Sequence, residues 1–209
     1  MKRWLMILAM LAMVGKALAG SSALAYTGVV TVDSASARPG ESITLAVRLT
    51  GNNIKITAAL LPLKYNPAVL TLDSVSFDPT FKPDGITGYY NNDIANKLIR
   101  IVYIPSFNKT PLDTITASSG VLAYLHFRVS PSATSQFAPI DSLNFDSIMV
   151  ATPTDTNHLT VRVEFADNTG VGVYLPGFTA GGVVVMVPTD VNESNLTALP
   201  GDYGLGQNY

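Results

Sequence analysis

The chain has 209 residues, of which 47% are hydrophobic and only 13% are charged, and its formal net charge is −2. This length suits one ordinary domain with extensions, and the sparse charge leaves Ser, Thr, Asn and Gly to cover the surface, as in many secreted all-β modules. The sequence contains no cysteine, which excludes disulfides, thiolate nucleophiles and cysteine-ligated metals.

The first 25 residues are typical of a secretory signal peptide. Lys2-Arg3 precedes an apolar run of 11 residues, Trp4–Val14, and small-x-small sequences end at Ala19 and Ala25. We predict a bacterial Sec signal peptide cleaved after Ala19 or Ala25, and therefore a secreted, extracellular or cell-surface protein. The alternative is a membrane anchor, which needs about 20 apolar residues. Cleavage after Ala25 removes three of the 13 basic residues and none of the 15 acidic ones, and the resulting charge of −5 argues against nucleic-acid binding.

Short apolar stretches separated by turn signals fill the rest of the chain, and no helical period persists. Alternation of apolar and polar residues at period two predicts strands with one buried face. We expect strands at Val29–Val32, Ser42–Leu49, Lys55–Tyr65, Val69–Phe77, Leu98–Ile104, Val121–Val129, Ser142–Val150, Leu159–Phe165, Val171–Leu175 and Val183–Val187. About eight to ten such strands predict an all-β fold, a nine-stranded antiparallel β-sandwich with jelly-roll or Greek-key topology, over residues 26–187, followed by a linker at 188–209.

Alternation also predicts which side chains face the core. The inward sets are Ile43, Leu45, Val47 and Leu49; Ala59, Leu61, Leu63 and Tyr65; Ile99, Ile101 and Tyr103; and Val121, Ala123, Leu125, Phe127 and Val129. Between two of the strands stands Tyr65-Asn66-Pro67. Because proline cannot donate to a sheet ladder and restricts the residue before it, the chain must bend or leave the sheet there.

The residues left on the outside of three strands are unusually apolar for a soluble protein. An exposed apolar patch usually marks a contact surface, with aromatic and Arg side chains as anchors. We therefore predict a partner-binding face on one sheet, made of Ala58, Leu60, Pro62, Arg100, Val102, Leu122, Tyr124 and His126, with Ile104 beside them. The alternative is that the loop Pro105–Ser119 or the C-terminal tail covers this face.

A second candidate site is the segment Tyr89-Tyr90-Asn91-Asn92-Asp93, which we expect to be a loop. Aromatic rings beside amide groups suit a sugar, because the rings stack on its C–H face and the amides bond to its hydroxyls. Tyr89, Tyr90, Asn91 and Asn92 are thus possible carbohydrate-binding residues. The alternative is a turn whose two tyrosines pack on opposite sides.

Catalysis is a poor fit to the sequence. His126 and His158 are the only histidines, at expected outward positions or strand ends, and no nucleophile elbow or zinc-protease motif occurs. Most acidic residues lie in expected turns, where Asp supports backbone geometry. The acidic segment at 190–194 lacks the glycine and glutamate of a calcium loop. We therefore expect no enzyme, no cofactor and no metal site.

Three short motifs resemble the cohesin family of cellulosome assembly. They are Leu63-Lys64-Tyr65-Asn66-Pro67-Ala68-Val69-Leu70, Gly120-Val121-Leu122-Ala123 and Phe178-Thr179-Ala180-Gly181-Gly182-Val183. The resemblance covers residues 28–187 and implies a nine-stranded jelly roll, related in fold to carbohydrate-binding modules, that binds dockerin modules on one sheet face. It also implies an outward Asn and Asp before the Tyr-Asn-Pro step, where this chain has Ala58 and Leu60.

The segment Leu205-Gly206-Gln207-Asn208-Tyr209 is similar to the start of C-terminal secretion and sorting domains of some Gram-negative bacteria. That similarity implies a surface-attachment domain after Tyr209. Three functions follow as hypotheses: a secreted cohesin-like module that binds dockerin or another protein in a polysaccharide-degrading assembly, a carbohydrate-binding sandwich whose partner is a polysaccharide, and a spacer or adhesin domain.

Overall fold

The computed structural model describes residues 26–143, 147–151, 156–160, 162–167 and 173–187. All regular elements in these ranges are strands. They are β1 (Val29–Val32), β2 (Ser34–Ala37), β3 (Ser42–Thr50), β4 (Ile56–Lys64), β5 (Leu70–Phe77), β6 (Ile86–Asp93), β7 (Leu98–Pro105), β8 (Gly120–Val129), β9 (Gln136–Ser142), β10 (Ser147–Ala151), β11 (Thr156–Thr160), β12 (Glu164–Asp167), β13 (Val173–Tyr174), β14 (Gly177–Thr179) and β15 (Gly181–Val185).

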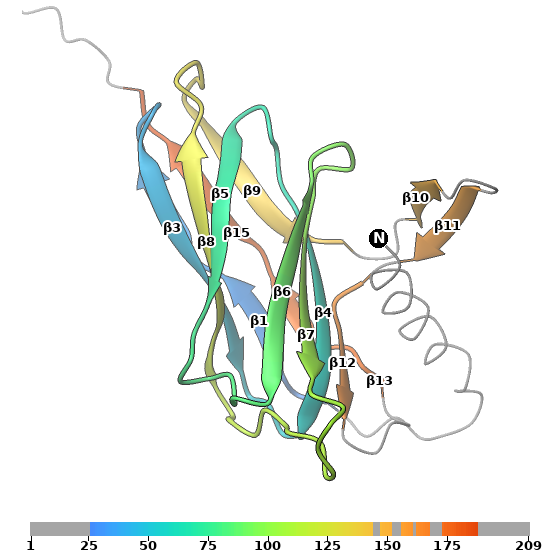
Figure 1. Cartoon of the computed structure of the whole chain (residues 1–209). Coiled ribbons are helices and arrows are strands. Elements are labelled where there is room, and N and C mark those ends of the chain that lie inside the picture. The colour runs from blue at the N-terminus through green and yellow to red at the C-terminus, as the bar shows by residue number, and fades with distance from the viewer. Residues whose placement is uncertain (1–25, 144–146, 152–155, 161, 168–172, 188–209) are drawn as a thin grey trace, which may run out of the picture.

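Two sheets face each other across one core, which confirms the predicted all-β sandwich (Figure 1). The five-stranded sheet has the order β14-β1-β3-β8-β5. The larger sheet has the order β13-β12-β4-β9-β15-β2, and β7 pairs with β4 and carries β6 on its other edge. The strands β10 and β11 pair only with each other among the described residues.

The inward faces follow the predicted alternation. Leu45, Val47 and Leu49 of β3 and Leu61 and Leu63 of β4 are all buried. The predicted sets of β7 and β8 are buried as well, with Tyr103 and Phe127 among the largest fully enclosed side chains. Burial of these β-branched, aliphatic and aromatic side chains between two layers supplies the main driving force for folding.

The Tyr65-Asn66-Pro67 corner carries the chain from one sheet to the other, because β4 belongs to the larger sheet and β5 to the five-stranded one. The Asn66 carbonyl accepts hydrogen bonds from the backbone of Val69 and Leu70, and the Asn66 side chain accepts one from the backbone of Ala68. The hydroxyl of buried Tyr65 donates to Asn92 Oδ1 over 2.8 Å. The predicted departure from the sheet at this proline is thus confirmed.

The chain crosses from one sheet to the other between β1 and β2 and again between β14 and β15. β1 pairs in parallel with β14 in the five-stranded sheet, whereas β2 pairs in parallel with β15 in the larger one. The predicted antiparallel arrangement is therefore wrong at these two pairs, where the N-terminal strands run in the same direction as the C-terminal strands beside them. At the crossing, Gly181 packs directly on the backbone of Val32 and Asp33.

Several expected strand limits in the C-terminal third are wrong. β9 ends where a strand Ser142–Val150 was expected to begin, and the expected strand Leu159–Phe165 is divided between β11 and β12. β9 itself was missed, because Pro139 lies in it and proline argues against a strand interior. The predicted signal peptide and linker, residues 1–25 and 188–209, lie outside the described residues and stay predictions, as does the sorting domain.

Tyr103 links the two sheets through the core. Its side chain is fully buried in β7, and its hydroxyl donates to the carbonyl of Leu122 in β8. Leu122 is the extra residue of a β-bulge, because the pairing of β3 with β8 shifts between Val47 and Arg48. A bulged residue is unpaired in the ladder, so its carbonyl can accept the buried phenol.

Replacement Gly181→Ala should destabilise the fold by about 2–3 kcal/mol, because the added methyl group would clash with backbone atoms that cannot easily move. A Cβ at this position would lie 2.1 Å from the Val32 carbonyl oxygen and 2.3 Å from that of Asp33. Gly177→Ala is the matched control, because its Cβ would meet two Val29 methyl groups at 3.3 and 3.7 Å and the Gly28 carbonyl oxygen at 3.9 Å. Urea unfolding of the two variants measures the difference, and equal midpoints would contradict the close crossing.

Replacement Tyr103→Phe should cost about 1–2 kcal/mol, because the Leu122 carbonyl loses its buried donor. The control is Tyr90→Phe on β6, whose side chain is 38% exposed, for which a change within about 0.5 kcal/mol is expected. Thermal and urea unfolding provide the comparison. A Tyr103→Phe protein as stable as the control would show that the interlayer bond contributes nothing.

Candidate functional site

The outer side of β4, β7 and β6 forms a continuous face, which we call the β4–β7–β6 face. Residues opposite each other in an antiparallel pair project to the same side of a sheet. One row across it is Leu60, Val102 and Tyr89, and the next is Pro62, Arg100 and Asn91. The structure therefore brings together five predicted contact residues, namely Ala58, Leu60, Pro62, Arg100 and Val102.

Strand β12 widens this face beyond β4. Glu164 pairs with Leu60, and Ala166 pairs with Ala58. Glu164 also lies 3.4 Å from the guanidinium of Arg162. These residues were missed in the sequence because they pair with a strand about a hundred positions away, and alternation carries no information on long-range partners.

The centre of the β4–β7–β6 face is apolar and partly exposed. Leu60, Val102 and Ile104 are half-buried, and Tyr89 at the side is 43% exposed. At one end Leu143 closes the face, because its backbone N–H donates to the Pro62 carbonyl over 3.1 Å and its side chain packs with Leu98.

The loop 105–119 does not cover the β4–β7–β6 face, which was one of the alternatives considered above. Ile115 is buried and exchanges two backbone hydrogen bonds with Ile56, and Asn52 bonds to the backbone of Ala117 and Ser118. These contacts hold the loop against the end of the sandwich, at the bottom of Figure 1. The tail, the other possible cover, lies outside the described residues.

A charged pair borders the apolar centre. The Arg100 guanidinium lies 2.6 Å from Asp93 Oδ2, and both side chains are largely buried. Burial acts to raise the pKa of Asp93, but hydrogen bonds from Asn96 and the charge of Arg100 outweigh it and hold that pKa below its usual value. Arg100 is thereby fixed in orientation beside Pro62 and Asn91.

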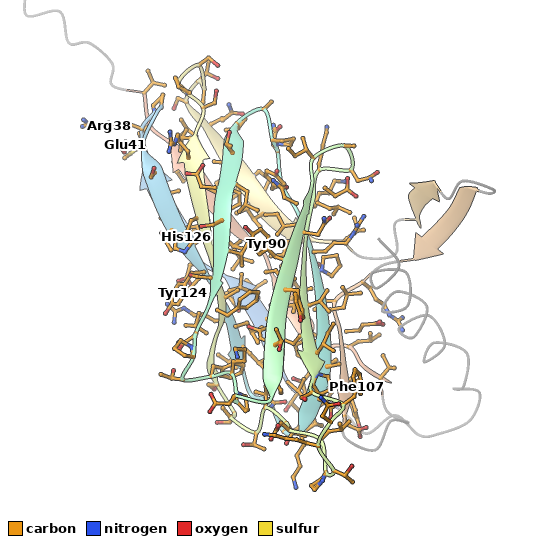
Figure 2. The ribbon with its side chains drawn as sticks, in the orientation of Figure 1. Arg38, Glu41, Tyr90, Phe107, Tyr124 and His126 are labelled. Carbon is orange, nitrogen blue, oxygen red and sulfur yellow. The ribbon has the colours of Figure 1, made fainter. Side chains whose placement is uncertain are left out.

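The other three predicted contact residues do not belong to this face. β8 lies in the five-stranded sheet, so Leu122, Tyr124 and His126 are separated from Leu60 by the core, and the prediction of one common face is wrong. The bulge turns Leu122 inward, where it is 1% exposed. Figure 2 shows Tyr124 and His126 on the side of the sandwich away from β4 and β7.

The segment Tyr89–Asp93 is not the expected loop but the second half of β6. Tyr89 and Asn91 pair with outward-facing Val102 and Arg100, whereas Tyr90 and Asn92 pair with the inward-facing Ile101 and Ile99. The four side chains therefore cannot surround one sugar, because successive residues of a strand point to opposite sides. The two tyrosines lie on opposite sides, as in the alternative we considered, but in a strand and not in a turn.

The described residues contain no group of three His, Asp or Glu side chains arranged to hold a metal ion. Nor does any helix in the same part of the chain have the length and hydropathy to cross a bilayer. The arrangement at the β4–β7–β6 face suits association with another macromolecule, because a flat, partly apolar surface edged by Tyr and Arg is typical of protein interfaces.

A family model described as "Cohesin domain" matches residues 28–171, which is more than half of the chain. The chain belongs to the cohesin family. No curated protein matches this cohesin significantly.

Solved cohesin structures share its fold at low sequence identity. The sixth cohesin of scaffoldin B from Acetivibrio cellulolyticus, solved in complex with a dockerin, is 18% identical with a TM-score of 0.58, over 77% of this chain and 99% of that one. A cohesin from Clostridium acetobutylicum is 16% identical with a TM-score of 0.55, over 77% and 92%. A non-cellulosomal cohesin from the archaeon Archaeoglobus fulgidus is 17% identical with a TM-score of 0.52, over 77% and 92%.

The ion pair at the edge of the face predicts a specific pH dependence. Because the folded pKa of Asp93 is lowered from 3.8, the pair stabilises the cohesin above that pH and its contribution is lost as the pH falls through the folded value. The unfolding free energy of the wild type minus that of Asp93→Asn should be constant near neutral pH and shrink in acid. Chemical denaturation from about pH 7 to pH 2 measures it, and a difference independent of pH would contradict the pairing.

Proposed function

We propose that this cohesin is an exported, non-catalytic binding module whose β4–β7–β6 face binds a dockerin-type protein module. Membership of the cohesin family supports the proposal. Several of the similar structures are cohesin–dockerin complexes, from Clostridium thermocellum and Acetivibrio cellulolyticus among others. The predicted signal peptide and the similarity of the tail to sorting domains support a role in attachment at the cell surface or in a polysaccharide-degrading assembly.

The observation that carries the proposal is the row of Leu60 and Val102 with Tyr89 at its side. Half-buried aliphatic side chains at the centre of a flat face lose their remaining water contact when a partner covers them, which favours association. Tyr89 and Arg100 belong to the residue types that most often dominate interface energies. The polar residues Asn91 and Glu164 border this centre, as a polar rim does.

The chemistry of this face also restricts the partner. Neither Ala58 nor Leu60 has a side-chain hydrogen-bonding group, so a polar partner residue buried against them would remain unpaired at a cost of about 1–3 kcal/mol. The dockerin that fits should therefore present aliphatic side chains over Leu60 and Val102. Because few charges lie at the centre, the affinity should depend only weakly on salt.

The test is calorimetric titration of the mature cohesin with dockerin modules encoded in the same genome. Leu60→Asp places a charge at the centre of the face and should weaken binding by about 2 kcal/mol or more, roughly 30-fold in Kd. Val184→Asp is the matched control, because Val184 lies in the same sheet on β15 and is 42% exposed. It pairs with Phe137, at the opposite end of β9 from the residues that pair with β4. The control should bind as the wild type does.

Two outcomes would contradict the proposal. Equal loss of affinity in both variants would place the contact elsewhere on the sheet or indicate a general defect. Absence of binding to every dockerin of the genome, with a folded wild-type protein, would favour the spacer or adhesin hypothesis instead.

A further inference from the structure

The outer side of the five-stranded sheet carries a polar stripe that the dockerin contact does not use. Tyr124, His126 and Arg128 project outward at every second position of β8. Alternate residues of a strand lie about 6.7 Å apart, so the stripe is roughly 13 Å long. Its neighbours are Thr44 on β3 and Ser76 on β5.

His126 is held between the two neighbouring strands. Thr44 Oγ1 lies 2.9 Å from its Nδ1, and Ser76 Oγ lies 2.8 Å from its Nε2. A neutral imidazole has one donor and one acceptor, so one hydroxyl donates to the ring and the other accepts from it. The donating hydroxyl keeps two acceptor sites, and the accepting one keeps its O–H for an outside ligand. The group thus presents both a donor and acceptors in a fixed arrangement.

Tyr124 lies beside this group with small residues on both sides. Its cross-strand partners are Ala46 on β3 and Ser76 on β5. Neither partner has a side chain large enough to cover an aromatic ring. Tyr124 is partly exposed, and Figure 2 shows it on the outer side of β8 next to His126. A ring in this position offers an apolar surface next to directional hydrogen-bonding groups.

The charges on this face are balanced within it. Arg48 donates from Nε and Nη2 to Asp33 at 3.0–3.2 Å, and Arg128 lies 3.6 Å from Asp73. Because each of these two guanidinium groups faces a carboxylate, the stripe has little attraction for phosphates or acidic polymers. A ligand that fits it is uncharged, rich in hydroxyls that both donate and accept, and apolar on one side.

We propose that the outer face of β3, β8 and β5 binds a neutral glycan chain, with Tyr124 stacking on a sugar ring and the Thr44–His126–Ser76 group hydrogen-bonding to its hydroxyls. The side chains of Thr44, His126 and Ser76 are already held by contacts with one another, which lowers the entropy lost on binding. The face lies on the opposite sheet from the β4–β7–β6 face. The cohesin can therefore hold a glycan and a protein partner at the same time.

Affinity gel electrophoresis of the mature chain in gels containing hydroxyethylcellulose, xyloglucan or galactomannan tests the proposal. At least one of these neutral polymers should retard the wild type, and Tyr124→Ala should bind it about tenfold more weakly, as loss of one stacking contact implies. His126→Ala should also lose affinity, whereas His126→Gln, which keeps a donor and an acceptor, should retain most of it. The matched control is Tyr89→Ala, which removes an exposed tyrosine of the other sheet. The polymers should retard this variant as they retard the wild type.

Retardation by polygalacturonate in preference to the neutral polymers would overturn the assignment of an uncharged ligand. Loss of retardation in Tyr89→Ala but not in Tyr124→Ala would place sugar binding on the opposite sheet, and absence of retardation in every gel would remove the glycan site. Circular dichroism and thermal unfolding check that each variant is folded. Dockerin titration of Tyr124→Ala separates this proposal from the previous one, because the dockerin affinity of this variant should equal that of the wild type.

Discussion

The buried phenol of Tyr103 constrains how the two sheets fit together. A hydroxyl enclosed in an apolar core requires an acceptor, and the carbonyls of a regular ladder are already paired. The bulge at Leu122 provides one, and the hydrogen bond fixes β7 relative to β8 across the core. The same bulge shifts the alternation of β8 by one residue, so that Leu122 packs inward while Tyr124 and His126 stay outside. The bulge thus removes Leu122 from the outer face, and the hydrogen bond to its carbonyl ties the two layers together.

The inward faces of β3, β4, β7 and most of β8 could be predicted, because period-two alternation depends only on neighbours in the sequence. The assignment of strands to sheets could not be predicted in the same way. β4 and β7 are adjacent, but β8 pairs with β3 and β5, and nothing in the alternation of Leu122 to His126 distinguishes the two possibilities. The predicted partner-binding face, assembled from all three strands, was therefore correct for the five residues of β4 and β7 and wrong for the three of β8. The correct part includes Leu60 and Val102, which lie opposite each other because β4 and β7 pair in one sheet.

The missed strands have their own physical causes. The segment Gly88-Tyr89-Tyr90-Asn91-Asn92-Asp93 contains residue types that are depleted in strands, yet β7 provides a complete ladder for it. Pro139 argues against a strand, but it lies opposite Gly182, where the backbones approach closely. In both places tertiary pairing overrides local preference. The Gly181-Gly182 pair could be recognised as a motif, whereas its cause, the crossing of the first and last strands, appears only in three dimensions.

A sandwich has two outer faces that share a core but no surface, and here the two differ in chemistry. The β4–β7–β6 face has aliphatic residues at its centre, which gain from losing water against an apolar partner. The face around His126 has hydroxyls, an imidazole and balanced ion pairs, which would lose hydrogen bonds with water if an apolar partner covered them. A protein interface therefore suits the first face, and a hydroxyl-rich polymer that replaces those hydrogen bonds suits the second. Because the core separates them, a surface substitution on one sheet can remove one interaction while the other persists.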